Sequence, residues 1–369
     1  MKQKKIFKKP LLAFVAIIFV VGAIALIEYQ KPGIKNNQSQ KDDNSTYPLA
    51  PEFSGIENWI NTKPLTMNEL RGKVVLVDFW TYTCINCIRT LPYLKEWDKK
   101  YSDKGLVIVG VHTPEFAFEK KYENVLKAVS EYNIKYPIAQ DNDYATWNAY
   151  QNRYWPHKFL IDADGRIRYD HIGEGGYDDT EKMIQKLLME RAQKLKIKDG
   201  ISDELTKIEN DGQIQPGDIG TPEIYLGYQF TRGNFGNPEG IQQDKTIDYS
   251  IPKTAVKANQ VYLEGKWKGN ADNMELVSDE GRIVLIFKAK KINVVAGSDL
   301  HSNISVSLDS KHLNETTKGD EVIIQNGKGI AKISEYKLYN LATAPNYDIH
   351  FVDLTVRGKG FKLYTFTFG

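Results

Sequence analysis

Cysteine is scarce in this sequence: Cys84 and Cys87 are the only two among 369 residues. So few cysteines exclude a small fold held together by many disulfides, and any disulfide chemistry belongs to this one pair. A zinc site would need further ligands, and the six histidines show no finger-like spacing. We therefore expect no metal and no bound cofactor, with a redox-active Cys84–Cys87 disulfide as the only reactive group.

An excess of positive charge is also absent from the body of the chain. Lysine and arginine number 49 against 47 aspartates and glutamates, and five of the lysines precede residue 10. Without those five the balance is 44 to 47, which leaves no surplus positive charge to neutralise phosphates. Nucleic acid is therefore not an expected partner.

One long apolar run is present, LLAFVAIIFVVGAIALI at residues 11–27, with lysines only in front of it. Its seventeen residues are at the lower limit for crossing a hydrocarbon core of about 30 Å. The positive-inside rule keeps the amino terminus in the cytoplasm and exports the rest. We expect a single transmembrane helix in a signal anchor over residues 1–28; a cleaved signal peptide, indicated by Ala23-Ile24-Ala25, is the alternative. Both interpretations place the bulk outside the cytoplasm, in the periplasm or at the cell surface.

The exported part divides into two predicted domains joined to each other and to the anchor by polar segments. Residues 29–48 have the composition of a flexible linker, and residues 196–217 read as an interdomain linker. Residues 49–195 form the first domain. Residues 218–369 form the second domain, in which helix signals nearly vanish and short alternating runs are separated by Gly, Asn and Asp. This second pattern is typical of an all-β sandwich, jelly-roll-like in form.

The first domain alternates apolar runs of strand length with amphipathic helical stretches, which predicts an α/β domain around a mostly parallel sheet. The expected strands are 74–79, 106–112, 136–139, KFLID and RIRYDHIG, with a tight turn between the last two. The expected helices are 84–101, 115–132, 144–150 and 179–194.

The motif with the clearest chemistry is Cys84-Ile85-Asn86-Cys87, which follows a predicted buried strand and opens a helix. Free backbone N–H groups and the helix dipole stabilise a thiolate there, so we expect the pKa of Cys84 to lie below about 8.5 and Cys84 to be the nucleophile. Cys87 lies three residues later on the same helical face and is placed to resolve a mixed disulfide. A zinc site and a static disulfide are the alternatives for the pair.

Neighbouring residues fit a redox site. Asp78, inside the apolar strand, is expected to have a raised pKa and to relay a proton to or from Cys87, with a solvated strand end as the alternative. Trp80 is expected to cover the redox site with aromatic surface; the alternative is that it only packs in the core. Trp155 precedes Pro156, and a cis peptide bond there would turn Trp155 toward the sulfurs. Glu115 and His112 are further site candidates. The alternative is that Glu115 is an ordinary acid at a helix start and His112 an ordinary histidine at a strand end.

The segment VVLVDFWTYTCINCIRTLPYL resembles the thioredoxin superfamily in its strand, Asp78, Trp80, paired cysteines and Pro92. The resemblance implies that Pro156 is cis. The preceding APEFSGIENWINTKPLTMNELRGK is similar to the amino-terminal hairpin of the TlpA and ResA group. The segments GVHTPEFAFEK, DNDYATWNAYQNRYWPHKFLID and YTFTFG resemble the exported part of DipZ-type proteins, from about residue 49 onward.

The DipZ resemblance implies a carboxyl-terminal domain like a carbohydrate-binding module, and with it a glycan or cell-surface ligand. This chain has one short apolar segment where DipZ-type proteins have a multi-helix electron-transporting domain. A separate CcdA- or DsbD-like membrane protein would therefore have to donate electrons. Three aromatic residues of this domain could stack on sugar rings: Trp267, Tyr228 and Tyr262. The alternative is that they pack in the core of the domain.

The sequence therefore predicts an extracytoplasmic, membrane-anchored thiol-disulfide oxidoreductase that reduces protein disulfides through a mixed disulfide. Ile85-Asn86 matches neither the Gly-Pro of reducing thioredoxins nor the Pro-His of strong oxidants. The reducing direction rests on Asp78 and the TlpA-like hairpin. One alternative is a thioredoxin-like peroxidase, since Thr81-x-x-Cys84 matches the end of the peroxiredoxin signature, although Val77 stands at its proline position. The other is a sugar or cell-surface binding protein whose redox domain is non-catalytic.

Overall fold

The computed structural model describes residues 46–369 except 199, 209–213, 215–216 and 254–255. The expected anchor at residues 1–28 and most of the linker at 29–48 lie outside the described residues. Within the described ranges no helix combines the length and the apolar character that crossing a bilayer requires.

The first domain is built on a six-stranded sheet in the order β1-β4-β3-β2-β5-β6. Its strands are β1 (Asn58–Ile60), β2 (Val74–Trp80), β3 (Leu106–His112), β4 (Ile138–Gln140), β5 (His157–Ile161) and β6 (Ile167–Ile172). The β2–β3 and β3–β4 pairs are parallel, whereas β1–β4, β2–β5 and β5–β6 are antiparallel. The sheet is therefore mixed, and the expectation of a mostly parallel sheet is wrong, because β5 runs antiparallel to the central strand β2. The predicted hairpin between β5 and β6 adds a second antiparallel pair on the same side.

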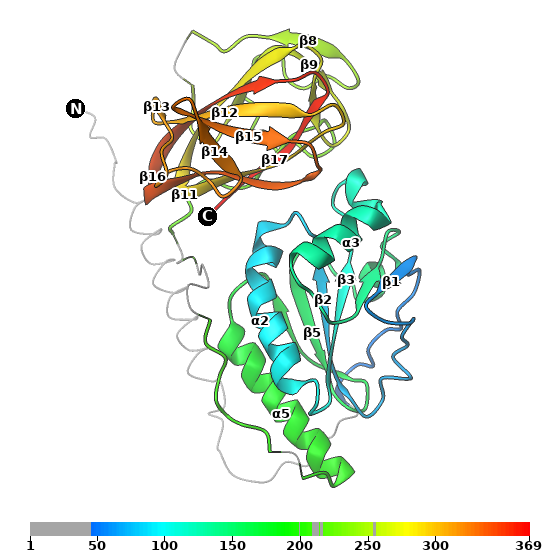
Figure 1. Ribbon diagram of the computed structural model, residues 1–369. Coiled ribbons are helices and arrows are strands. Elements are labelled where there is room, and N and C mark those ends of the chain that lie inside the picture. Colours follow the sequence, from blue (N-terminus) through cyan, green and yellow to red (C-terminus); the bar gives the residue numbers. More distant parts are fainter. Residues whose placement is uncertain (1–45, 199, 209–213, 215–216, 254–255) are drawn as a thin grey trace, which may run out of the picture. The chain divides into compact units, whose positions relative to one another are not determined.

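Helices cover the sheet on both faces. The helices are α2 (Ile85–Tyr101), the 3-10 turn η2 (Ala117–Lys120), α3 (Tyr122–Glu131), α4 (Ala145–Ala149) and α5 (Tyr177–Leu195). Figure 1 shows α2 and α5 running along the sheet. Alternate residues of β2 supply the two cores: Val74 and Leu76 pack with α2 and α5, whereas Val75 and Val77 pack on the other face with Trp147 of α4.

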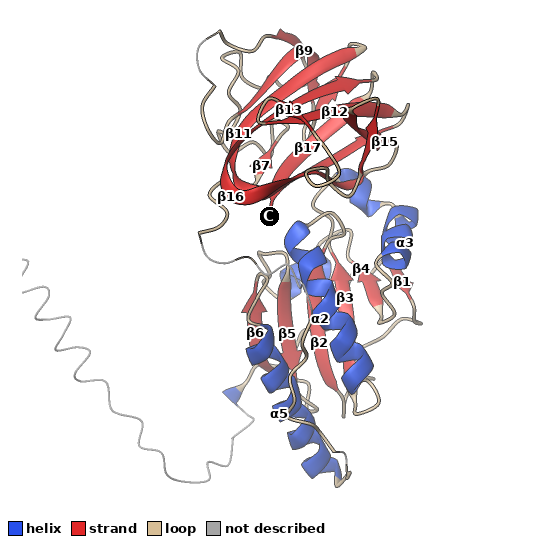
Figure 2. Ribbon diagram, turned by 60° about the vertical axis from the view of Figure 1, so that its left-hand side comes forward, coloured by secondary structure: helices blue, strands red, loops and turns tan. Residues whose placement is uncertain are grey.

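The second domain contains strands and no helix among the residues described after Asp218. Its eleven strands belong to one hydrogen-bonded sheet, visible in Figure 2. They are β7 (Ile224–Tyr225), β8 (Thr246–Tyr249), β9 (Val261–Gly269), β10 (Met274–Leu276), β11 (Glu280–Ser298), β12 (Ser302–Leu308), β13 (Lys311–His312), β14 (Val322–Gln325), β15 (Lys328–Ile333), β16 (Lys337–Arg357) and β17 (Phe361–Phe368).

The all-β prediction is confirmed, but the strands do not form the two separate sheets of the expected sandwich. The first half of β11 pairs with β9 and its second half pairs with β17, while β10 joins β9 to β17. These pairings close a small barrel. The sequence pattern indicates strands and turns. It does not indicate that one strand of nineteen residues, β11, pairs first with β9 and then with β17.

Two of the aromatic residues considered for sugar stacking lie in the interior. Trp267 is 0% exposed and its indole N–H donates to the carbonyl of Glu264, while Tyr262 is 4% exposed. Neither ring offers a face to a ligand, so the core-packing alternative holds for both. Tyr228 is half-buried.

Gly110 provides a stability test close to the redox site. A Cβ at this position of β3 would lie 2.6 Å from Cδ1 of Ile138 and 3.0 Å from the indole nitrogen of Trp80. We expect Gly110→Ala to destabilise the fold by about 1–3 kcal/mol because both neighbours are packed in the core. Urea unfolding followed by tryptophan fluorescence measures this change.

The matched control is Gly200→Ala, whose added Cβ meets no atom within 4 Å. We expect the control to change stability by less than about 1 kcal/mol. Equal stability of the two variants would contradict the close packing of β3 against Trp80.

Candidate active site

The two cysteines lie where β2 gives way to α2. Cys84 is the N-cap residue of α2, with φ −74° and ψ 113°, and its sulfur accepts a hydrogen bond from the backbone N–H of Cys87 at 3.2 Å. The two sulfur atoms are 2.6 Å apart, and both residues are free thiols. Cys84 is partly buried and Cys87 is 1% exposed. Only a small movement would bring the sulfurs to the S–S bond length of about 2.05 Å.

Burial, rather than the helix terminus, dominates the acidity of both thiols. Burial raises the pKa of Cys84 above its ordinary value, and its hydrogen bonds with Cys87 lower that pKa without reversing the direction. The expectation that Cys84 ionises more easily than a free cysteine is therefore wrong for the reduced form. Cys87 has its pKa raised further, first by burial and then by its contact with Cys84 and the charge of Asp78.

Asp78 is a buried carboxyl group that acts on Cys87. It is 1% exposed, stands opposite Lys158 in the β2–β5 register, and its Oδ1 has no hydrogen-bond partner among the described residues. Burial raises the pKa of Asp78 from 3.8 to about 7, while the ammonium of Lys158 opposes the rise. Lys158 is itself 0% exposed and donates to the carbonyl of Gly173 at 2.9 Å. This carboxyl group can gain or lose a proton near neutral pH, as a relay requires.

The Trp155–Pro156 peptide bond is cis, the isomer that the resemblance implies. The Trp155 indole N–H donates to the carbonyl of Thr113 at 3.0 Å, and its ring lies 4.2 Å from that of Trp147. Trp155 packs against the hydrophobic cluster that contains both cysteines. Trp80 is a buried member of the same cluster. Its ring therefore packs in the core and also helps to shield the thiols from water.

His112 is a packed, neutral imidazole. It is 0% exposed, its Nε2 lies 3.3 Å from the Thr81 hydroxyl, and its ring stacks on Tyr82 at 5.7 Å. Burial lowers its pKa to about 3. Its described contacts are with these neighbours and with Trp80, rather than with either sulfur. These contacts favour the alternative that His112 is an ordinary packed histidine at a strand end.

Glu115, in contrast, is electrostatically coupled to Cys84. Its carboxylate accepts a hydrogen bond from the Tyr225 hydroxyl at 2.8 Å, and burial raises its pKa to about 8. The charges of Glu223 and Glu115 both raise the pKa of Cys84. Sequence reasoning missed Tyr225 and Glu223 because they are more than 130 positions away from the cysteines and carry no local motif.

Glu119 holds the loop that carries Glu115. Its buried carboxylate accepts from the Thr83 hydroxyl at 2.6 Å and from the backbone N–H groups of Glu115 and Phe116 at 2.6 and 2.9 Å. These three hydrogen bonds tie the segment after β3 to the residue just before Cys84. The sequence offered no signal that separates this glutamate from an ordinary surface acid.

Aromatic side chains from both domains meet beside this loop. Phe118 lies 4.7 Å from Tyr364 and 5.2 Å from Tyr336 between ring centroids, and Phe116 lies 5.1 Å from Tyr364. Tyr225 and Tyr364 belong to the same hydrophobic cluster as the two cysteines. Side chains of the second domain therefore belong to the apolar surroundings of the two thiols.

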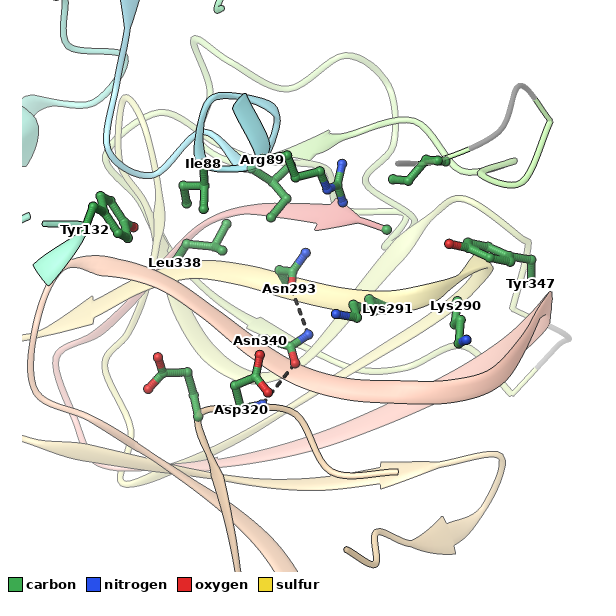
Figure 3. A pocket seen from close by; sticks show the side chains of 14 residues that line it. Ile88, Arg89, Tyr132, Lys290, Lys291, Asn293, Asp320, Leu338, Asn340 and Tyr347 are labelled. Carbon is green, nitrogen blue, oxygen red and sulfur yellow. Dashed lines mark hydrogen bonds between the residues drawn. The ribbon is translucent and has the colours of Figure 1, made fainter. Parts of the chain in front are cut away.

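A pocket of about 730 Å³ opens next to the cysteine motif (Figure 3). Ile85, Ile88 and Arg89 of α2 line one side. The opposite side is polar: Asn340 donates to Asn293 at 2.9 Å and accepts from the backbone N–H of Asp320 at 3.0 Å. Other lining residues are Tyr132, Ile214, Lys290, Lys291, Glu321, Leu338, Tyr347 and Gly369.

Comparison with known proteins agrees with this site. A family described as Redoxin matches residues 48–188, and one described as Thioredoxin like C-terminal domain matches residues 221–369. Protein DipZ of Mycobacterium bovis is 35% identical over 87% of this chain, which spans 43% of that protein's length. Thiol-disulfide oxidoreductase YkuV of Bacillus subtilis is 31% identical over 38% of this chain and 94% of its own length. Thiol-disulfide oxidoreductase ResA of Bacillus cereus is 29% identical over 49% of this chain and 98% of its own length. A solved thioredoxin-like protein in the oxidised form is 30% identical, with a TM-score of 0.37, over 39% of this chain and 97% of its own.

The mixed sheet and the paired thiols at the start of α2 define the class of this protein, a thioredoxin-like thiol-disulfide oxidoreductase. The redoxin match and the relatives that share the Cys84–Cys87 region agree with that class. The chain belongs to the thioredoxin-like redoxin family, as the resemblance of the first domain implies, and residues 221–369 match the family described as Thioredoxin like C-terminal domain.

Asp78 gives the fold a pH dependence with a definite sign. Because its pKa is about 7 in the folded state and near 3.8 when unfolded, the native state binds a proton that the unfolded state has lost between these values. Stability therefore falls as pH rises from about 4 to about 7. We expect Asp78→Asn to remove this slope and to stabilise the protein above pH 7 by up to about 4 kcal/mol.

Urea unfolding at several pH values measures the slope, and the exposed carboxylate variant Asp103→Asn is the control that keeps it. A wild-type slope that persists in Asp78→Asn would show that another group carries this titration.

Proposed function

We propose that this protein is a membrane-anchored reductant of protein disulfides that works outside the cytoplasm. The observation that carries the reducing direction is the burial of the two thiols, which is partial for Cys84 and almost complete for Cys87. A strong disulfide oxidant stabilises its reduced form as a thiolate of very low pKa. Here burial raises the pKa of both cysteines, so the thiolate gains no such stabilisation and the disulfide form is favoured by comparison.

The reaction proceeds in two exchanges. The Cys84 thiol loses its proton and its sulfur attacks one sulfur of the substrate disulfide, which forms a mixed disulfide and releases the other sulfur as a thiol after it takes up a proton. Cys87 then gives a proton to the Asp78 carboxylate, and its sulfur attacks that of Cys84, which breaks the mixed disulfide and releases the second substrate sulfur as a thiolate that takes up a proton. The enzyme dithiol is oxidised to a disulfide, and the substrate disulfide is reduced to two thiols.

The order of the two cysteines follows from their exposure. Cys84 is partly buried at the helix N-cap, whereas Cys87 lies 1% exposed behind it. A substrate sulfur can reach Cys84, and Cys87 is reached by way of Cys84. Cys84 is therefore the nucleophile and Cys87 the resolving residue.

Variants of the two cysteines test this order. The assay measures the reduction of insulin disulfides. We expect Cys84→Ser to abolish turnover and to form no mixed disulfide with the substrate. Cys87→Ser still attacks but cannot resolve, so it accumulates a mixed disulfide that non-reducing electrophoresis detects. Adduct formation by Cys84→Ser with none by Cys87→Ser would reverse the roles, and wild-type-like turnover in both would exclude disulfide reduction by the pair.

The proposed location rests on the apolar run at residues 11–27 and its one-sided lysines. A protein-disulfide substrate outside the cytoplasm needs a source of electrons, for which we propose a separate CcdA- or DsbD-like membrane protein. Protease digestion of intact cells tests the location, since degradation of the bulk of the chain requires exposure outside the cytoplasm. Loss of the reduced form in cells that lack the membrane donor tests the partner.

The carboxyl-terminal domain is proposed to take a glycan or cell-surface ligand at the pocket beside α2. The exposed carboxylate of Asp320 and the exposed ring of Tyr347 are groups suited to sugar hydroxyls and sugar faces. Glycan-array binding by the whole chain, compared with Tyr347→Ala, tests this role. Binding that is absent, or unaffected by the substitution, excludes this pocket.

A further inference from the structure

Tyr225 joins two carboxyl groups that come from different domains. Its hydroxyl oxygen lies 2.8 Å from Oε1 of Glu115, on the loop after β3, and 2.9 Å from Oε2 of Glu223, next to β7. Tyr225 is 6% exposed, and both glutamates are half-buried. The three groups therefore form one hydrogen-bonded chain with little access to water.

This geometry has a consequence for protons. A phenol has one hydrogen and can donate one strong hydrogen bond, so it satisfies one of the two carboxylates. The second carboxyl oxygen lies just as close to the phenol oxygen, and two acceptors at that distance repel unless the carboxyl group is protonated and donates. The arrangement is satisfied when Glu115 and Glu223 hold one proton between them.

The charges around the pair agree with a shared proton. Glu119 faces Glu115 with a like charge, and the Arg232 guanidinium lies 4.6 Å from the centre of the Tyr225 ring as the nearby opposite charge. Burial raises the pKa of Glu115 to about 8, so the pair keeps a proton at neutral pH.

The loop that carries Glu115 lies next to the nucleophile, because the Glu119 carboxylate binds both the backbone N–H of Glu115 and the hydroxyl of Thr83, the residue before Cys84. Glu223 and Glu115 are the two carboxylates whose charges raise the pKa of Cys84. Tyr225 and Cys84 pack in one hydrophobic cluster, where screening by water is weak. A change in the protonation of the pair is therefore felt at the Cys84 sulfur.

We propose that the carboxyl-terminal domain completes the redox site: Glu223 and Tyr225 form with Glu115 a carboxyl pair that holds one proton and controls the ionisation of Cys84. This inference deepens the proposed function and rests on Cys84 being the nucleophile; Glu223 and Tyr225 act through Cys84 as positioning residues.

The test is the pH profile of Cys84 alkylation by iodoacetamide in the reduced full chain, read at Cys84 by mass spectrometry. Above about pH 8, where the pair has lost its shared proton, Glu223→Gln leaves one negative charge near the sulfur in place of two, so we expect the midpoint of the profile to fall by about one pH unit. Glu115→Gln should lower it in the same direction, which provides a second variant from the other domain. The control Glu264→Gln removes a carboxylate from β9 that pairs with Arg282, and it should leave the midpoint unchanged.

The hydroxyl is tested separately. If Tyr225 couples the carboxyl groups, the shift caused by Glu223→Gln should be smaller in a Tyr225→Phe background. An unchanged midpoint in Glu223→Gln and Glu115→Gln overturns the proposal, and an equal shift with and without the hydroxyl overturns the shared proton. Alkylation needs no substrate disulfide, so these outcomes are independent of whether the wild-type chain reduces insulin.

Discussion

The structure depends on one placement: Cys84 stands at the N-cap of α2, separated by three residues from the end of a strand that is buried along its whole length. The strand fixes where the helix begins, and the helix places the Cys87 sulfur 2.6 Å from that of Cys84. The same strand carries Asp78 into the core on the α2 side of the sheet. Strand, helix and buried carboxyl group thus form one unit, and the rest of the thioredoxin-like domain holds it in position.

Burial then determines the chemistry of this unit. A helix N-terminus favours a thiolate, but burial raises the pKa of Cys84 by more than its hydrogen bonds with Cys87 lower it. Part of that burial comes from the second domain, through Tyr225, Tyr336 and Tyr364. The carboxyl-terminal domain is therefore an element of the redox site's environment, in addition to any ligand it binds itself.

Local features of the site were predictable from the sequence. The β2 run, the cysteine pair and Asp78 lie within fourteen residues, where strand and helix periodicity place them directly. What depends on distant contacts was not predictable. The antiparallel pairing of β5 with β2 made the sheet mixed, β11 closed a barrel by pairing with two strands, and the charge of Glu223 acts on Cys84 from the other domain. The acidity of Cys84 was mispredicted for the same reason, because a motif reveals the helix dipole but not the burial.

The measurement that tests the account most directly is the reduction potential of the Cys84–Cys87 pair, determined by equilibration with glutathione and counting of free thiols. Buried thiols without thiolate stabilisation predict one two-electron couple near the thioredoxin value of about −270 mV. A potential near −120 mV, the value of a strong oxidant with a stabilised thiolate, would contradict both the burial argument and the proposed direction of the reaction.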